Sequence, residues 1–367
     1  MWLLCGAGLM IILDGTIVTV ALPTIQRSLG FSPSSLGWVM NAYLIAFGSL
    51  LLLAGRLGDL SGRKRVLGCG LAVFTAASLL CGLATSPAML ITARFVQGIG
   101  GAMVSAVSLG MIVTLFPEPI EQAKAIGAFS FVGAGGASIG LVLGGVLTQT
   151  VGWHWIFFVN VPIGIAASLL AVKVLDADHG SGLGSRADWL GASLATAGLM
   201  LGVYAIGGTT QYGWGATRTI LAVALAVGLL TVFVIRQATA RTPLLPLRIF
   251  SARSVTGANL AQLLVIAAAF GFQVIVTLYV QRVLGDSAAI SGLSLLPTAA
   301  VIGTVSLGFS ARIAARFGHR LMLLSGLLLI AVALALLAGC RCTEATWRTC
   351  SGRSCCSARA AASPCPH

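Results

Sequence analysis

Uninterrupted apolar runs of about 18–25 residues recur along almost the whole chain, and each is long enough to cross the roughly 30 Å of hydrocarbon in a bilayer. Only 8% of the 367 residues are charged, against about 25% in a soluble domain. Lipid offers the backbone no hydrogen-bond partner, so runs of this length form helices. The sequence therefore predicts an all-α, polytopic transmembrane helical bundle with about 11 spans. They are expected over residues 2–22, 37–56, 66–84, 88–113, 125–148, 156–175, 189–208, 218–236, 254–281, 289–309 and 321–340.

Basic residues between the spans predict the orientation. With the N-terminus in the cytoplasm, fourteen Lys and Arg residues lie at the inner connections and three at the outer ones. Cytoplasmic loops of membrane proteins carry such an excess. We therefore expect a multi-pass protein of the cell inner (cytoplasmic) membrane with a cytoplasmic N-terminus, and we attribute the net charge of +13 to orientation rather than to nucleic-acid binding. The outer residues are Arg27, Arg218 and Arg282.

Asp14 is the only carboxylate inside an apolar run, and it lies near the middle of the first one. At ~1.5 Å per residue it is about 12 Å from Leu22, too deep for so short a side chain to reach the headgroups. A charge at this depth costs at least ~2.5–3.5 kcal/mol on insertion scales. Such a residue tends to face a partner or a cavity inside the protein. Asp14 is therefore a candidate functional residue.

A short loop with a basic triplet follows the second span. It reads Gly55-Arg56-Leu57-Gly58-Asp59-Leu60-Ser61-Gly62-Arg63-Lys64-Arg65. Its glycines favour a tight turn, and Asp59 stands four residues before Arg63, where it can pair with that arginine or cap a helix. We predict a conformational gate at the cytoplasmic surface, with an ordinary positive-inside loop as the alternative. The predicted gate residues are Gly55, Asp59, Gly62, Arg63 and Lys64.

This loop resembles the signature of the major facilitator superfamily, Gly-x-Leu-x-Asp-Arg-x-Gly-Arg-Lys, with Leu60 where the first Arg usually stands. Three more segments resemble motifs of that superfamily in the same order. Residues 13–23 resemble the first-helix motif of the fourteen-span drug:proton antiporters (the QacA-like and EmrB-like group), and residues 94–102 resemble the fourth-helix motif. Residues 153–162 resemble the Trp-Arg-Trp segment that enters the sixth helix, with His154 in place of Arg.

The resemblance implies a transporter rather than an enzyme. Its expected activity is proton-coupled export of hydrophobic or cationic drugs and related small molecules, with no cofactor and no metal ion. The expected partners are a small-molecule substrate, protons and the lipid bilayer. The oligomeric state stays open, with a monomer favoured. The alternative within transport is a metabolite exporter of the same superfamily, and an alternative outside transport is a truncated product without transport activity.

The resemblance also divides the chain into four parts. Residues 1–175 are expected to form a six-helix bundle, residues 189–236 the two-helix insert of fourteen-span members, and residues 254–340 an incomplete C-terminal bundle. Residues 341–367 form a Cys- and Arg-rich tail without Leu, Ile, Val, Phe or Met, whose cysteine spacing fits no zinc template. Disulfides in an exported tail are one explanation. We expect instead a truncated member that left its reading frame at the start of this tail, with three more spans encoded downstream in another frame.

Arg94 is a second charge inside an apolar run, in the fourth span. Counting ~1.5 Å per residue places it about 9 Å from the outer end of that span, a depth close to that of Asp14. The first and fourth helices line the central cavity in the superfamily, so the resemblance makes Asp14 and Arg94 a candidate proton-coupling pair. A static salt bridge between two helices is the alternative.

Glycines in the fifth span predict close helix packing. Gly136, Gly140 and Gly144 recur every four residues and, with Gly145, form a small-residue face. This face resembles the antiporter motif of the superfamily, although Leu141 stands where that motif has Pro.

The same stretch offers a weak alternative from another functional class. Gly136-Ala137-Ser138-Ile139-Gly140 fits the Gly-x-Ser-x-Gly nucleophile pattern of serine hydrolases. An intramembrane hydrolase would need a histidine within hydrogen-bond reach of Ser138. All four histidines lie in loops, at span edges or in the tail, which favours helix packing.

Overall fold

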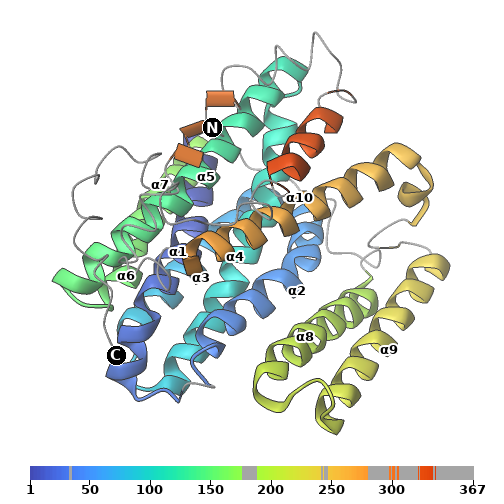
Figure 1. Ribbon diagram of the computed structural model, residues 1–367. Helices are drawn as coiled ribbons and strands as arrows, with labels where there is room; N and C mark the ends of the chain where they lie inside the picture. Colours follow the sequence, from blue (N-terminus) through green and yellow to red (C-terminus); the bar gives the residue numbers. More distant parts are fainter. Residues whose placement is uncertain are drawn as a thin grey trace, which may run out of the picture.

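The computed structural model describes residues 1–32, 35–175, 188–240, 243 and 247–279, with short pieces between residues 297 and 335. The elements of this part are all helices (Figure 1). Eight of its helical segments are long and apolar enough to cross a membrane, which confirms the predicted all-α transmembrane bundle. In chain order the elements are α1 (Trp2–Leu29), α2 (Trp38–Ser61), α3 (Arg63–Gly82), α4 (Pro87–Leu115), α5 (Pro119–Thr150), α6 (Trp155–Phe158), α7 (Asn160–Val174), α8 (Trp189–Tyr212), α9 (Thr217–Thr239), the 3-10 helix η1 (Leu247–Ser251) and α10 (Arg253–Leu278).

The last three predicted spans are described only in part. α10 corresponds to the ninth of them, predicted over residues 254–281. Within the regions predicted for the tenth and eleventh spans, the longest described piece is the apolar helix Leu323–Ala333. The tail, residues 341–367, lies outside the described residues. The predictions for the tail and for a complete set of 11 spans therefore stay predictions.

Several helices extend beyond the apolar runs that predicted them, and α1 and α5 do so the furthest. α1 continues through Pro23 to Leu29, seven residues past the predicted end, and stops at Gly30, whose φ of 70° lies in the left-handed region. α5 covers Pro119–Thr150 instead of residues 125–148. Hydropathy marks only the part of a helix that faces lipid, so polar end turns escape it.

The predicted sixth span contains a helix break. α6 ends at Phe158 and α7 begins at Asn160. Pro162 has no N–H to donate to the carbonyl of Phe158, and its ring crowds that carbonyl. The hydrogen-bond ladder is therefore interrupted at Val159, although its φ of −60° and ψ of −27° stay in the right-handed helical region, and α7 begins at Asn160.

Glycines let α4 approach its neighbours closely. A Cβ on Gly98 would lie 2.5 Å from the carbonyl oxygen of Tyr43 in α2, and one on Gly100 would lie 2.8 Å from that of Gly70 in α3. Because lipid tails are as apolar as side chains, helices in a bilayer associate through close packing rather than through the hydrophobic effect. α4 is therefore held directly against α2 and α3.

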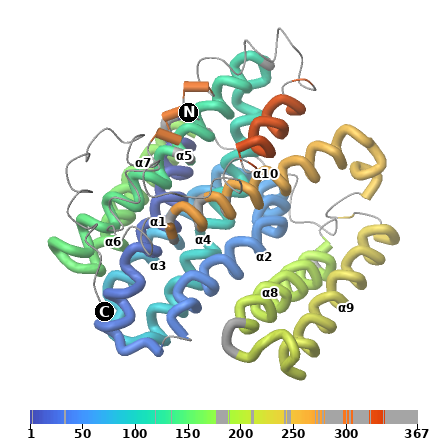
Figure 2. The backbone as a smooth tube through the Cα atoms, in the orientation of Figure 1, coloured from blue at the N-terminus to red at the C-terminus, as the bar shows by residue number. Residues whose placement is uncertain are grey.

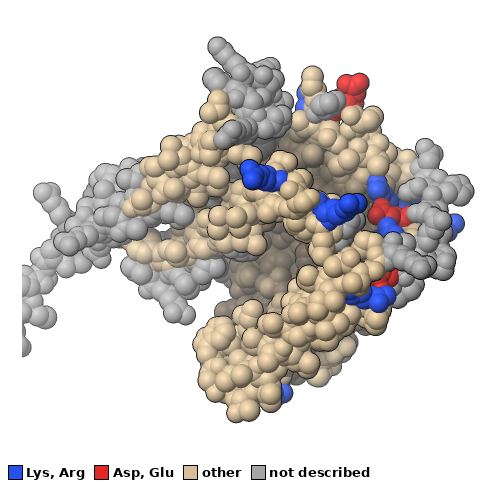
Figure 3. All heavy atoms as spheres, turned by 90° about the vertical axis from the view of Figure 1, so that its right-hand side faces the viewer, with Lys and Arg blue, Asp and Glu red and all other residues tan. Residues whose placement is uncertain are grey.

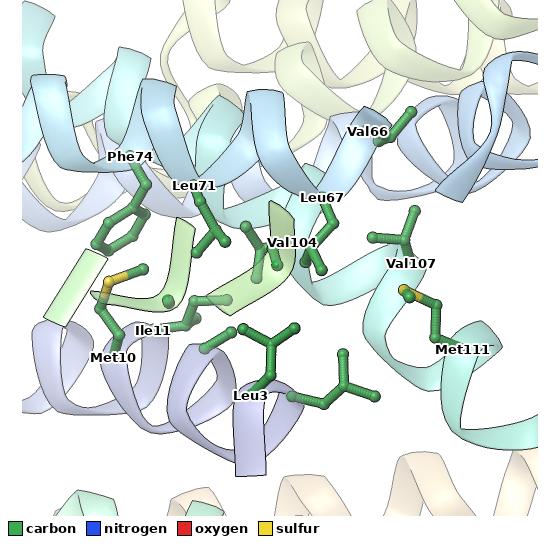
Figure 4. Packing of buried hydrophobic residues seen from close by; sticks show 14 of the residues in the cluster. Leu3, Met10, Ile11, Val66, Leu67, Leu71, Phe74, Val104, Val107 and Met111 are labelled. Carbon is green, nitrogen blue, oxygen red and sulfur yellow. The ribbon is translucent and has the colours of Figure 1, made fainter. Parts of the chain in front are cut away.

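Apolar side chains pack the helices on both sides of Asp14. One cluster joins Met10 of α1 with Phe74 of α3 and Val104 of α4 (Figure 4). A second cluster contains Ile17 and other residues further along α1. Asp14 lies between the two along the helix, so the environment around its carboxylate is closed to water from both directions.

α8 and α9 form a helical hairpin that lies beside α2 (Figure 2). The Thr196 hydroxyl of α8 donates a hydrogen bond of 3.3 Å to the carbonyl oxygen of Ser49 in α2. The ring centroids of Trp38 and Tyr204, from the same two helices, are 5.4 Å apart. The hairpin thus packs on the bundle mainly through one helix.

Large apolar side chains cover much of the outer surface of the described helices, with Val172 and Leu221 among the most exposed. On the face seen in Figure 3, charged residues gather toward one side and leave wide uncharged areas. A water-facing surface rarely carries apolar areas this large, whereas a lipid-facing one does. The chain is a multi-pass membrane protein.

Candidate functional site

A buried ion pair joins α1 to α4. The side chains of Asp14 and Arg94 are fully buried, and Arg94 Nη1 donates to Asp14 Oδ2 at 2.6 Å. The two charges that the sequence placed at similar depth are therefore in direct contact. A buried pair of this kind is stable only when its remaining donors and acceptors are also hydrogen-bonded.

Two amide side chains complete the surroundings of the Asp14 carboxylate. Gln97 Nε2, one helical turn from Arg94 on α4, donates to Asp14 Oδ1 at 2.8 Å. Asn160 Nδ2, at the start of α7, donates to the same oxygen at 2.9 Å. With Arg94 on Oδ2, three donors surround the carboxylate and both of its oxygens accept hydrogen bonds.

Arg94 is held by α2 as well as by α1. Its Nε donates to the carbonyl oxygen of Val39 at 3.1 Å, and its guanidinium carbon lies 4.4 Å from the centre of the Tyr43 ring. Its Nη1 also donates to Gln97 Oε1 at 2.6 Å. The guanidinium therefore keeps several partners besides Asp14, including a cation–π contact.

Gln97 extends the network to α3. Its Nε2 donates to the Ser78 hydroxyl at 2.7 Å, and the Cys81 thiol lies 3.7 Å from its Oε1. These contacts connect α1, α2, α3, α4 and α7 through one buried polar cluster, which we call the central network (Asp14, Arg94, Gln97, Ser78 and Asn160).

Three buried polar atoms at or beside the central network have no hydrogen-bond partner in the described part of the chain. They are Arg94 Nη2, the Tyr43 hydroxyl and Asn160 Oδ1. Two donors and one acceptor thus remain unused in this arrangement. Buried polar atoms are rarely left without a partner, so the network has the capacity to adopt a second hydrogen-bonding pattern.

Most of the predicted gate loop is helical: residues 55–61 are the last of α2, residues 63–65 are the first of α3, and the turn between the helices is Gly62 alone. Residues 55–65, which we continue to call the gate loop, join the ends of four helices. Arg63 donates to Asp59 Oδ1 at 3.2 Å and also to the Gly110 carbonyl at 2.9 Å and the Thr114 hydroxyl at 3.1 Å, both on α4. Lys64 Nζ donates to the carbonyls of Val172, at 3.1 Å, and of Leu175 at the end of α7. The basic residues of the loop therefore satisfy carbonyls at the C-terminal ends of α4 and α7.

Glycines fix the shape of this loop. Gly62 has a φ of 97°, in the left-handed region, where α2 passes into α3. A Cβ at Gly55 would lie 3.9 Å from the Ala106 side chain of α4, an ordinary contact distance, so space does not require glycine there. Of the two gate glycines, Gly62 is the one whose backbone demands the residue type.

The glycine face of α5 lies against α1. A Cβ on Gly136 would meet the Leu9 side chain at 2.8 Å, and one on Gly144 would meet the Ile17 carbonyl oxygen at 2.8 Å. A Cβ on Gly140 would overlap the Thr16 hydroxyl. Gly145 is also buried. The glycines set the close approach of α5 to the helix that carries Asp14.

Two titratable groups lie just outside the spans. Burial lowers the pKa of His154, so this residue is neutral at pH 7 and does not supply the charge of the Arg whose place it takes. Burial alone would raise the pKa of Asp188, but hydrogen bonds from the Gly191 N–H, Arg236 and Gln237 outweigh it and the pKa is lowered. Asp188 therefore stabilises the fold at neutral pH, and this contribution is lost only as the pH falls through its lowered pKa.

The Asp188 cluster was not predicted from the sequence. Asp188 accepts from Arg236 Nε at 2.7 Å and caps the N-terminus of α8 through the Gly191 N–H at 2.9 Å. It thereby joins the ends of α8 and α9. The signal in the sequence was an Asp immediately before an apolar helix, the usual place of an N-cap.

Long apolar helices packed through glycines around a buried, hydrogen-bonded charge pair define a polytopic membrane protein. The sequence profile of the Major Facilitator Superfamily matches residues 4–350. The chain belongs to the Major Facilitator Superfamily, as its motifs predicted. This membership excludes the serine-hydrolase alternative, and Ser138 is a buried residue of the α5 packing face.

Curated relatives with high similarity are named for export or resistance. The chain is 43% identical over 309 residues to a cephamycin export protein of Amycolatopsis lactamdurans, covering 83% of this chain and 63% of the relative. It is 38% identical over 332 residues to a puromycin resistance protein of Streptomyces alboniger, covering 90% of this chain and 66% of the relative. The chain thus spans slightly less than two thirds of the length of these relatives.

Solved structures support the fold. A proton:xylose symporter of the same superfamily matches with a TM-score of 0.54 at 16% identity, over 86% of this chain and 68% of that one. The human organic anion transporter MFSD10 matches with a TM-score of 0.52, also at 16% identity, over 85% of this chain and 71% of that one. At such identities the match concerns the arrangement of the helices alone.

Proposed function

We propose that the chain carries out proton-coupled export of hydrophobic or cationic small molecules across the cytoplasmic membrane, with its N-terminus in the cytoplasm. The observation that carries this proposal is the fully buried Asp14–Arg94 pair at the centre of the central network. An ionisable pair in the interior of a membrane protein is typical of proton pathways in transporters. Relatives named for cephamycin export and puromycin resistance support the class of substrate.

We further propose that the protein is a fourteen-span antiporter. The α8–α9 hairpin, which lies beside α2, supports this assignment because it has the place in the chain of the two-helix insert. In this proposal the helices from α1 to α7 form one bundle and α10 begins the second. Transport then proceeds by movement of one bundle against the other around a site near the middle of the membrane.

The central network supplies the coupling step. While Asp14 is ionised it holds Arg94, and α1 and α4 stay joined. A proton on Asp14 removes the charge that attracts Arg94, and a cationic substrate competes for the same carboxylate. Arg94 can leave Asp14 at moderate cost because it keeps the Val39 carbonyl, Gln97 and the face of Tyr43. The proton and the cationic substrate thus bind the same carboxylate in turn, and the entry of one accompanies the release of the other.

Transport into liposomes tests this proposal directly. The purified protein would be reconstituted in vesicles with an imposed pH gradient, and movement of a fluorescent cationic dye would be followed. We expect dye accumulation that grows with the gradient and stops when a protonophore collapses it. Dye movement that does not depend on the pH gradient contradicts proton coupling. No movement by a folded protein favours the truncated product, and preference for neutral or anionic metabolites in a mixed panel favours the metabolite exporter.

The gate loop gives a second prediction. We expect Arg63→Gln to shift the balance between states open and closed to the cytoplasm more than Asp59→Asn does. The Asp59 side chain is 47% exposed, so its ion pair is worth at most about 1 kcal/mol. Arg63 also loses two hydrogen bonds to α4, each worth roughly 0.5–1.5 kcal/mol. Reactivity of cysteines introduced at the cytoplasmic mouth measures the balance.

Arg65→Gln is the matched control for this measurement, because Arg65 is an exposed residue of the same loop. It makes the same change of charge without removing the contacts to α4, and substrate binding should persist in all three variants. Equal reactivity and equal transport in the three variants would mean that the loop serves only to orient the protein in the membrane.

A further inference from the structure

Asn160 makes one hydrogen bond and leaves its other polar atom unused, although it is fully buried. Its Nδ2 donates to Asp14 Oδ1 at 2.9 Å, whereas its Oδ1 has no partner among the described residues. A buried amide oxygen without a partner is unfavourable. A second state of the protein in which this oxygen accepts a hydrogen bond would satisfy it.

Protonation of Asp14 creates such a state. Oδ2 faces the guanidinium of Arg94, which repels a proton, so the proton enters on Oδ1. The new O–H is a donor and points toward the amides of Gln97 and Asn160, both of which present N–H donors to Oδ1. Two donors facing each other cannot form a hydrogen bond. One of the two amides must turn and offer its oxygen.

Gln97 is fixed in its present orientation. Its Oε1 accepts from Arg94 Nη1 at 2.6 Å, and its Nε2 donates to the Ser78 hydroxyl at 2.7 Å as well as to Asp14. Turning the Gln97 amide would point its NH2 group at the guanidinium and break both contacts. Asn160 has no comparable second contact on its oxygen, so rotation of its amide by about 180° exchanges one hydrogen bond for another.

We infer that Asn160 is a positioning residue that senses the protonation state of Asp14 by turning its side-chain amide. This inference rests on the proposed proton coupling through Asp14. In the ionised state Asn160 donates to the carboxylate, and in the protonated state it accepts from the carboxylic acid. Each state is thereby satisfied, and the change of partner is transmitted to α7.

The place of Asn160 in the fold suits this role. It is the first residue of α7, directly after the break at Val159. The far end of α7 is held by Lys64, a residue of the predicted gate. A change of hydrogen bonding at Asn160 therefore acts on a helix that connects the central network to the gate loop.

Other groups around Asp14 are accounted for. Arg94 on α4, Tyr43 on α2 and Cys81 on α3 are the titratable side chains that interact electrostatically with this site in the described part. α5 presents glycines to α1, among them Gly140. Of the three, Arg94 is hydrogen-bonded to Asp14 and has donors only, whereas the Cys81 thiol contacts Gln97 Oε1 and the Tyr43 ring packs against the Arg94 guanidinium.

The pH profile of transport in proteoliposomes separates a turning amide from a fixed donor. Asn160→Leu keeps the branching and the number of side-chain heavy atoms but neither donates nor accepts. If Asn160 serves both protonation states, the two losses offset, so the pH of half-maximal rate stays nearly unchanged while the rate falls by about tenfold. If Asn160 only donates to the carboxylate, the variant moves that pH upward by about one unit, since one hydrogen bond to the charged form is lost. The second result overturns the inference.

A second variant and a spectroscopic measurement distinguish the proposed role of Asn160 from misfolding of the Asn160→Leu protein. Asn160→Ser carries a hydroxyl that both donates and accepts, so it should recover part of the rate at an unchanged pH midpoint. Infrared difference spectra between high and low pH should show an asparagine amide band that is absent from Asn160→Leu. Its presence in that variant also contradicts the inference. Loss of coupling in Asp14→Asn with native behaviour of Asn160→Leu would defeat this inference alone, whereas intact coupling in Asp14→Asn would defeat the proposed function.

Discussion

Replacement of Asp14 by asparagine is expected to abolish export driven by a pH gradient while the protein still reaches the membrane. Asparagine has nearly the same shape, and its oxygen can still accept from Arg94 Nη1, which also retains Val39 and Gln97. It cannot exchange a proton at any pH used in transport, so one of the two alternating occupants of the site is lost. Proteoliposomes with an imposed gradient measure the effect, and we expect a rate at background level.

Asp188→Asn is the matched control. It makes the same substitution at another buried carboxylate that is paired with an arginine, but at the end of the α8–α9 hairpin and away from the central network. We expect reduced stability of the hairpin and retained coupling. Undiminished proton-driven export by Asp14→Asn, or equal loss in both variants, would show that Asp14 is not the coupling carboxylate.

The second large expected effect is a loss of stability, and it should differ between a variant that removes Asp14 and one that removes Arg94. Asp14→Leu leaves Arg94 buried and unpaired, and a guanidinium cannot release its proton. Arg94→Leu leaves a carboxylate that can neutralise itself by binding one. Removing one partner of a buried pair costs about 3–5 kcal/mol, and we expect Asp14→Leu to approach this loss and Arg94→Leu to fall clearly below it.

Thermal unfolding of the two variants and of the double variant in detergent measures this difference. The double variant Asp14→Leu/Arg94→Leu should be more stable than Asp14→Leu alone, because no charge is left without a partner. Equal destabilisation by the two single variants would show that the central network does not depend on the charge of Arg94.

The lengths of the apolar runs were enough to predict the helices, because a segment of about 20 apolar residues can form all its backbone hydrogen bonds in lipid only as a helix. They could not predict where α1 ends. Residues Thr24 to Leu29 mix polar and apolar side chains, and the stop is set by the left-handed backbone of Gly30 rather than by hydropathy. The break between α6 and α7 was readable from Pro162 and went unpredicted.

Counting residues placed Asp14 and Arg94 at one depth, and their contact then follows from the packing of α1 and α4 in the same bundle. The uncharged members of the central network gave no comparable signal, because an amide in an apolar run costs far less than a charge. Gln97 was within reach of prediction, since it lies three residues after Arg94 on the same helix face. Asn160 was not, because it lies on a different helix from both charges.

In the proposed fourteen-span assignment the α8–α9 hairpin is an added pair of spans, and its position then bears on how such transporters diversify. A pair of spans returns the chain to the side of the membrane that it left, so α10 enters with the direction it would have without the pair. Because α8 contacts the bundle mainly through α2, only the lipid-facing side of that one helix needs to complement the added hairpin. The perimeter of the transporter can therefore be enlarged in a single modular step, while the charged interior that α1, α4 and α7 share is inherited without change.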